Sequence, residues 1–249
     1  MTLAIGVPYS KGLLVCCDRG LPDGEEQKLF RLRPDAAFST VGWCKFATSH
    51  PQWSFDTRVI TQAFFERGSG PIEAAWEPFG QYIANSWHSF TRRVEMSSLF
   101  SSLSRNNDFL FSIMGYYLPN SQSIAFAFTH LHLADHGRPK VTQKISNCPK
   151  TGKAQVYVAG CTVLPKAIAA GESSVSHLVN KPIYQKFYQV RPSIPTICEA
   201  EALEVAITLI ADTSADTRNE FGHKVSRTCD CAVLEYGSGF RWLHNPLVQ

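Results

Sequence analysis

Four short apolar runs in the first 42 residues constrain the fold of this chain more than any other feature. The runs are residues 3–7, 12–17, 29–32 and 36–41. Proline-containing turns separate them in pairs, at Pro8-Tyr9-Ser10-Lys11 and at Pro34-Asp35. Short apolar runs bounded by Pro and Gly fit β-hairpins better than helices. The sequence therefore predicts two consecutive hairpins at the start of the chain.

The remaining elements follow in groups rather than in strict alternation. Helices are predicted over residues 57–66, 71–90 and 199–212, with another beginning at Pro165. Strands are predicted over residues 109–117, 123–133 and 156–158, and a closing hairpin over residues 228–235 and 240–243. This order suits an α+β protein in which stacked antiparallel sheets carry helices on their outer faces.

Length and charge limit the class of protein. A chain of 249 residues with 44% hydrophobic content can bury one large core, so we expect one domain over residues 1–249. The net charge of +3 is spread along the chain, which indicates neither nucleic acid nor a membrane as a partner. No apolar run has the length of a membrane helix and no secretory signal is visible, so we expect a cytoplasmic protein.

The eight cysteines are expected to be thiols in a reducing compartment rather than a disulfide framework. Cys16, Cys17 and Cys161 lie in apolar strand-like runs, where cysteine behaves as a small buried hydrophobe. Cys229 and Cys231 have no second pair at the spacing of a zinc ribbon. We therefore interpret them as strand packing.

Three stretches near the N-terminus follow one another in an order that a known family shares. They are TLAIGV with Thr2, GLLVCCDRG with Asp18, and the stretch KLFRLRPDAAFSTVGW, which includes Lys28 and Gly42. Together they resemble a proteasome β-type subunit of the N-terminal nucleophile hydrolase family. Weaker similarity covers PIEAAWEPFGQYI, VYVAGCTVLPKAIAAG and EALEVAITLIADTSAD. The resemblance, closest to a divergent bacterial proteasome-like member, implies a four-layer αββα sandwich. It also implies a homo-oligomeric ring that acts on peptides or unfolded proteins without a cofactor, and it leaves an ATPase partner open.

The chemistry of these residues is consistent with that family. Removal of Met1 would leave Thr2 with a hydroxyl nucleophile and an α-amine, whose pKa of about 7.7 to 8.0 suits a general base. A Lys28 ammonium would lower the pKa of the hydroxyl, and Asp18 would pair with it. The backbone N–H near Gly42 could stabilise the oxyanion. Each residue alone also fits a structural role, as a turn, an edge lysine or a strand end, but their joint occurrence favours a threonine peptidase.

Departures from the family pattern leave a second hypothesis open. The stretch between Asp18 and Lys28 is shorter than is usual, and Cys161 stands where the family has a supporting serine. Asp216 is the candidate for a second supporting acid, but the serine that follows it in the family is missing. The chain could therefore be a catalytically inactive, structural proteasome-like subunit.

A third hypothesis is a zinc hydrolase. The cluster His130, His132, Asp135 and His136 is similar to the H-x-H-x-D-H motif of metallo-β-lactamase-like enzymes, but one extra residue precedes the aspartate. His130 and His132 more simply alternate onto one face of a strand. The favoured interpretation contains no metal site.

Overall fold

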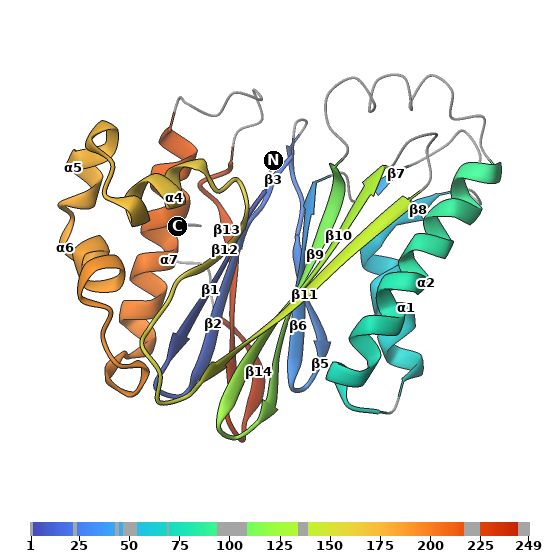
Figure 1. Ribbon diagram of the computed structural model, residues 1–249, viewed down its shortest axis with the longest axis horizontal. Helices are drawn as coiled ribbons and strands as arrows, with labels where there is room; N and C mark the ends of the chain where they lie inside the picture. Colours follow the sequence, from blue (N-terminus) through green and yellow to red (C-terminus); the bar gives the residue numbers. More distant parts are fainter. Residues whose placement is uncertain are drawn as a thin grey trace.

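The computed structural model describes residues 2–21, 24–42, 45–46, 54–68, 70–93, 109–133, 139–216 and 225–243. These residues form four layers, with two antiparallel sheets stacked between two layers of helices (Figure 1). The prediction of an α+β, four-layer αββα sandwich is therefore confirmed.

The first sheet has five strands in the order β12-β1-β2-β13-β14. The strands are β1 (Leu3–Tyr9), β2 (Gly12–Asp18), β12 (Tyr157–Gly160), β13 (Cys229–Glu235) and β14 (Gly239–Leu243). The first predicted hairpin is present, but β1 continues through Pro8 to Tyr9, so the turn is shorter than expected. Proline is tolerated there because β12 pairs with residues 3–6, and among the described residues no strand pairs with that side of Pro8.

The second sheet also has five strands, in the order β11-β10-β9-β6-β5. The strands are β5 (Leu29–Arg33), β6 (Ala36–Gly42), β9 (Phe109–Asn120), β10 (Ser123–Leu133) and β11 (Pro139–Pro149). Two short ribbons join β3 (Gly20–Leu21) to β4 (Gly24–Glu25) and β7 (Lys45–Phe46) to β8 (Phe55–Asp56). Our sequence analysis missed β11. Its residues are mostly exposed or half-buried, because this edge strand depends on pairing with β10 rather than on its own burial.

The helices cover the outer faces of the two sheets (Figure 1). The second sheet carries α1 (Thr57–Arg67) and α2 (Ile72–Arg93). The first sheet carries α4 (Val163–Ala170), α5 (Ser176–Val179), α6 (Pro182–Tyr184) and α7 (Glu199–Ala215), with the short η2 (Ser173–Val175), η3 (Gln185–Val190) and η4 (Ile194–Thr196) between them. All four predicted helices are present, with bounds shifted by a few residues, and the short helical turns between α4 and α7 were not foreseen.

Two apolar clusters hold the layers together. The first extends from α7 through the first sheet to the inner face of the second and includes Leu209, Leu14 and Phe126. The second fills the space between the second sheet and helices α1 and α2, where Trp76 and Trp87 are buried among phenylalanine rings. The helical spacing of apolar residues in α2 is therefore explained by its packing on the sheet.

One sequence expectation about the cysteines was wrong. Cys16 of β2 and Cys231 of β13 form a disulfide between directly opposed residues, with a Cα–Cα distance of 4.3 Å. Directly opposed residues of an antiparallel pair that share no hydrogen bonds lie about this close, at roughly 4.5 Å. Burial in a strand and formation of a disulfide are compatible here, because the two strands are neighbours in space although they are far apart in sequence.

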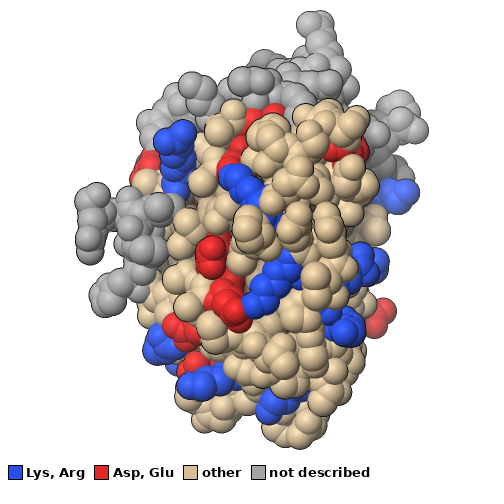
Figure 2. Space-filling view, turned by 90° about the vertical axis from the view of Figure 1, so that its left-hand side faces the viewer, with Lys and Arg blue, Asp and Glu red and all other residues tan. Residues whose placement is uncertain are grey.

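The surface over the helical layer α4 to α7 is electrostatically mixed. On this face, basic and acidic side chains lie interspersed, with no large patch of one sign (Figure 2). Lys181 pairs with Asp212, and Lys186 pairs with Glu201. None of the helices in the described part of the chain is long and apolar enough to cross a membrane.

Candidate active site

Thr2 lies directly before β1 and is almost fully buried, with 3% of its surface exposed. Its carbonyl oxygen accepts a hydrogen bond from the backbone N–H of Cys161 at 2.8 Å. The neighbouring pair Leu3↔Gly160 begins the β1–β12 ladder. The backbone of Thr2 is therefore held at the end of the first sheet.

Gly160 makes room for Thr2. It has a φ of 90°, and a Cβ atom at this position would lie 1.9 Å from the Thr2 carbonyl oxygen and 2.9 Å from Cγ1 of Val41. Real Cβ atoms do not approach backbone oxygen this closely, so only glycine fits here without displacing Thr2. Our sequence analysis did not single out Gly160, because its role depends on a contact between distant parts of the chain.

The carboxyl group of Asp18 lies at the centre of a hydrogen-bond network. Asp18 ends β2 and is fully buried. Its Oδ1 accepts a hydrogen bond from the Leu3 N–H at 2.6 Å, and its Oδ2 accepts hydrogen bonds from the N–H groups of Gly20 at 2.9 Å and Ser226 at 3.3 Å. The carboxyl group therefore joins the residue after Thr2 to two other segments of the chain.

Lys28 supplies the charge that opposes Asp18. Its Nζ lies 3.4 Å from Oδ2 of Asp18 and donates a hydrogen bond to the carbonyl oxygen of Gly20. Burial raises the pKa of Asp18 above its ordinary value, while Lys28 and the three backbone N–H donors act in the opposite direction. The hydrogen-bond partners of the two oxygens among the described residues are the Lys28 ammonium and three backbone N–H groups, all donors, and donors favour an ionised carboxylate.

Gly42 ends β6, where it is exposed and has a φ of 94°. The strand is tied to Lys28, because the N–H of Thr40 donates to the Lys28 carbonyl oxygen at 3.0 Å. Gly42 thus lies two positions beyond a residue that is bonded to Lys28. Its assignment as the oxyanion donor stays a prediction.

The two tentative supporting residues lie in different surroundings. Cys161 is 2% exposed and contacts Thr2 through its backbone N–H. Asp216 lies at the C-terminal end of α7, where its N–H donates to the carbonyl oxygen of Thr213 at 3.3 Å. Participation of the Cys161 thiol and of the Asp216 carboxyl group in the site stays a prediction.

Our sequence analysis missed Ser226. Besides the bond from its N–H to Asp18, its hydroxyl donates to Glu25 at 3.0 Å and shares a hydrogen bond of 2.7 Å with Thr228. In the resembling family a serine directly follows the aspartate that Asp216 matches, whereas Ser226 lies just beyond the stretch ADTRNEFGHK. The sequence signal for Ser226 is its position at the start of the final hairpin.

The histidines of the alternative zinc site lie on β10. Nδ1 of His130 is 2.5 Å from the Ser112 hydroxyl oxygen, and burial together with nearby His132 lowers the His130 pKa. Asp135 and His136 lie outside the described residues. Within the described residues, no group of three His, Cys, Asp or Glu side chains is arranged to hold a metal ion.

Comparison with known proteins gives matches among solved structures alone. No protein-family model and no curated protein matches the chain. It is similar to an Anbu (Gly-1) mutant from Hyphomicrobium sp. strain MC1, with 10% identity and a TM-score of 0.49, over 98% of this chain and 86% of that chain. It is also similar to Anbu (ancestral beta-subunit) from Yersinia bercovieri, with 12% identity and a TM-score of 0.44, over 96% and 86% of the two chains. Both TM-scores are below 0.5, so neither neighbour supports a function for this chain.

Proposed function

We propose that this protein is an N-terminal threonine hydrolase, a proteasome-like peptidase that cleaves peptide bonds through an acyl-enzyme on Thr2. The observation that carries the proposal is the buried Asp18 carboxyl group, which accepts a hydrogen bond from Leu3 N–H and pairs with Lys28. Burying two charges costs desolvation free energy, so stability alone is a weak reason for this ion pair. Beside Thr2, we infer that it serves to activate the hydroxyl group.

The proposed reaction begins once Met1 has been removed from Thr2. The Thr2 hydroxyl oxygen attacks the peptide carbonyl carbon, and the α-amine takes the hydroxyl proton. The Gly42 N–H stabilises the negative oxygen of the tetrahedral intermediate, and the proton then passes to the leaving amine. Water activated by the α-amine hydrolyses the ester on Thr2.

Lys28 assists in this scheme without exchanging a proton. Its ammonium group favours the deprotonated form of the Thr2 hydroxyl and the neutral form of the α-amine. Asp18 pairs with this ammonium group at a buried position, where 5% of the lysine surface is exposed. The substrates proposed are peptides or unfolded chains.

The first experiment combines intact mass spectrometry with a threonine-directed β-lactone. We expect the purified protein to lack Met1 and to gain one inhibitor mass on Thr2. Thr2→Ala should gain none and should lose peptidase activity, while Thr142→Ala, which alters an exposed threonine of β11, should behave like the wild type. Retention of Met1 would refute the proposal, because the nitrogen of Thr2 would then be an amide and could not act as a base.

An inactive structural subunit is the second candidate, and Cys161 is the observation that favours it. A thiol donates a weaker hydrogen bond than the serine found there in the resembling family, so support for the α-amine would be reduced. Protein that has lost Met1 yet resists the β-lactone would establish this alternative. Metal content of the same sample tests the zinc hypothesis, which needs a stoichiometric signal.

We also propose a homo-oligomer, as the sequence resemblance implies. Light scattering after size exclusion should then give an integer multiple of the 27.7 kDa chain mass. A monomer at micromolar concentration would contradict this part of the proposal while leaving the chemistry of Thr2 open to its own test.

A further inference from the structure

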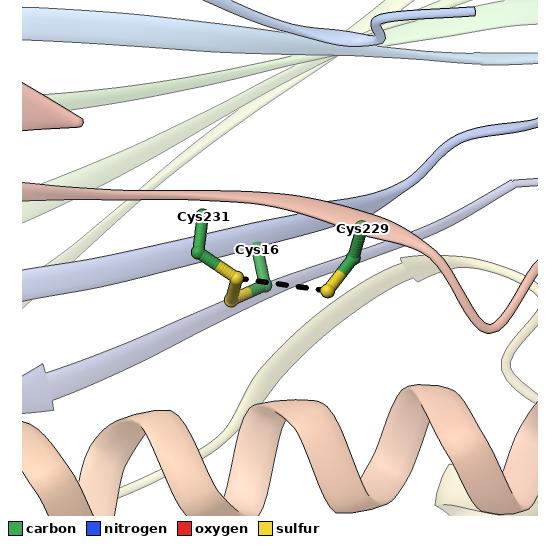
Figure 3. Close-up of a disulfide and its surroundings, with 3 residues drawn as sticks. All are labelled: Cys16, Cys229 and Cys231. Carbon is green, nitrogen blue, oxygen red and sulfur yellow. Dashed lines mark hydrogen bonds between the residues drawn. A yellow bond between two sulfur atoms is a disulfide. The ribbon is translucent and has the colours of Figure 1, made fainter. Parts of the chain in front are cut away.

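Three sulfur atoms gather beneath the first sheet, close to the candidate active site. Cys16 and Cys231 form the disulfide, and Sγ of Cys229 lies 3.7 Å from Sγ of Cys231. Figure 3 shows the three side chains projecting from strands β2 and β13 toward the helix below them. All three residues are buried, with 0% or 1% of their surface exposed.

The pairing register connects this sulfur cluster to Asp18. In the β2–β13 ladder, Cys231 faces Cys16, and two positions further along Cys229 faces Asp18. The strands then remain joined beyond the ladder, because the Arg19 N–H donates to the Thr228 carbonyl oxygen at 3.0 Å. The disulfide is thus a covalent link in the ladder that ends at the Asp18 carboxyl group.

The same register decides which groups reach Asp18. Ser226 lies just before β13, and its N–H is one of the three backbone donors to the carboxyl group. Its 3.3 Å bond is the longest of the three, so it is the most sensitive to a shift of β13 against β2. A covalent bond between the two strands restricts local opening at this end of the ladder, which hydrogen bonds alone permit.

We propose that the Cys16–Cys231 disulfide positions the Asp18 carboxyl group and thereby makes the chemistry of Thr2 depend on redox state. This inference rests on the function proposed above. The cysteines act as positioning residues, since they act through Asp18 and Lys28. In the reduced protein, β13 and Ser226 move more freely, Asp18 loses a donor part of the time, and the Lys28 ammonium is held less firmly.

Reduction requires an external dithiol, which reaches the buried sulfur atoms when the strands open locally, and the electrons balance. One thiolate of the reductant attacks a sulfur of the disulfide, and the Cys16–Cys231 bond breaks to leave a mixed disulfide and one protein thiol. The second thiol of the reductant closes its own disulfide, so that both protein cysteines end as thiols. The reductant is oxidised by two electrons and the protein is reduced by two.

Cys229 lies close enough to the disulfide to exchange with it, but its thiol is not reactive. Burial raises its pKa to about 12, with nearby Asp230 and Asp18 adding to the effect. A thiol with this pKa is protonated at neutral pH and is a poor nucleophile, so it does not displace Cys16 from Cys231. The proximity of a third sulfur therefore does not scramble the disulfide in the folded protein.

The first test measures the link itself, without any assay of activity. Protein unfolded in urea and treated with an alkylating reagent should keep Cys16 and Cys231 unmodified unless a dithiol has been added first. In the folded protein, hydrogen exchange should accelerate about tenfold on reduction in peptides covering residues 2–9 and 225–235, and stay constant in residues 111–133. Alkylation of both cysteines without reductant, or unchanged exchange near Ser226, would overturn the inference.

The second test measures the consequence at Thr2. We expect the β-lactone to label the reduced protein about tenfold more slowly, with an altered pH profile, and reoxidation to restore the rate. The double variant Cys16→Ala/Cys231→Ala should be labelled at the rate of the reduced protein, with or without the dithiol. Cys148→Ala should be labelled at the rate of the wild type and should respond to the dithiol. Reduction of the folded wild type keeps the test available if the double variant does not fold.

The two tests separate the inference from the function on which it rests. If exchange responds to the dithiol but neither form is labelled, the proposed function fails and the disulfide still positions Asp18. If both forms are labelled at the same rate with the same pH profile, the function stands and redox dependence is refuted.

Discussion

Lys28 and Asp18 place two opposite charges almost completely out of water, with side-chain exposures of 7% and 0%. Lys28→Met would leave the carboxyl group buried without its ammonium partner. Removing one member of a buried pair costs about 3 to 5 kcal/mol, so we expect the free energy of unfolding in urea to fall by about that amount. Lys144→Met changes an exposed lysine of β11 and should stay within about 0.5 kcal/mol of the wild type.

A second variant separates loss of charge from loss of packing. Asp18→Asn/Lys28→Met removes both charges, so it should be more stable than Lys28→Met alone. If the single variant were as stable as the wild type, the ion pair could not be the reason that these side chains are buried together.

Gly160 allows a second prediction at residue scale. Gly160→Ala places a methyl group against the carbonyl oxygen of Thr2, so we expect a loss of stability of more than 2 kcal/mol, about the cost of a strained backbone plus a clash. Labelling of Thr2 by a β-lactone should fall with it. Thermal unfolding and intact mass spectrometry measure the two effects.

Gly171 offers a matched control for this substitution. It also has a positive φ, of 68°, but a Cβ there would meet no atom within 4 Å. Gly171→Ala should therefore cost about 1 kcal/mol, the intrinsic penalty of the left-handed conformation. Equal losses in the two variants would show that contact with Thr2 is not what excludes a side chain at Gly160.

The residues of the candidate site differ in how far sequence could identify them. Thr2, Asp18 and Lys28 lie within the first 28 residues, beside or on two early hairpins that belong to different sheets. The structure indeed brings Asp18 and Lys28 together. Ser226 reaches Asp18 across a sequence separation of 208 residues, and no local pattern encodes a contact of that range.

At the scale of elements, α2 was predictable because its apolar residues recur at helical spacing. Trp87 is fully buried on this helix, with ring centroids 4.9 Å from Phe46 and 5.0 Å from Phe55. Trp87→Ala should lower the free energy of unfolding by about 3 to 5 kcal/mol, because it removes a large buried side chain and leaves a cavity. Chemical denaturation followed by circular dichroism measures this loss.

Trp242 provides the control for Trp87. It lies on the edge strand β14 and is 43% exposed. Trp242→Ala should cost less than about 1 kcal/mol, since little apolar surface returns to water. If both tryptophans cost the same, burial beneath α2 would not be the source of the stability.

Elements that depend on their neighbours were harder to predict. The strand β11 has few apolar residues, and exposed residues alternate with half-buried ones along most of it, so its sequence does not predict a strand. It exists because β10 offers a matching edge along its whole length, from Ser123↔Pro149 to Leu133↔Pro139. Pairing partners of this kind are supplied by the fold and not by the segment itself.

At the scale of the whole molecule, the apolar cluster between the sheets includes side chains from both sheets and from α7. Because both sheets share this core, we expect them to unfold together, as a single domain requires. Urea unfolding followed by tryptophan fluorescence and by far-ultraviolet circular dichroism should therefore give coincident transitions under oxidising conditions. Two separate transitions would contradict the single domain over residues 1–249.

The sequence alone determined the hairpins and the helix faces, because these depend on periodicity and on turns between neighbouring residues. A family resemblance pointed to Asp18 and Lys28, which the structure pairs. The tertiary structure alone decided the Cys16–Cys231 disulfide, which spans 215 residues, the contact of Ser226 with Asp18, and the need for glycine beside Thr2. Each of these requires two distant segments to meet at ångström distances. That meeting depends on how the layers stack and on the register between strands, which no local pattern specifies.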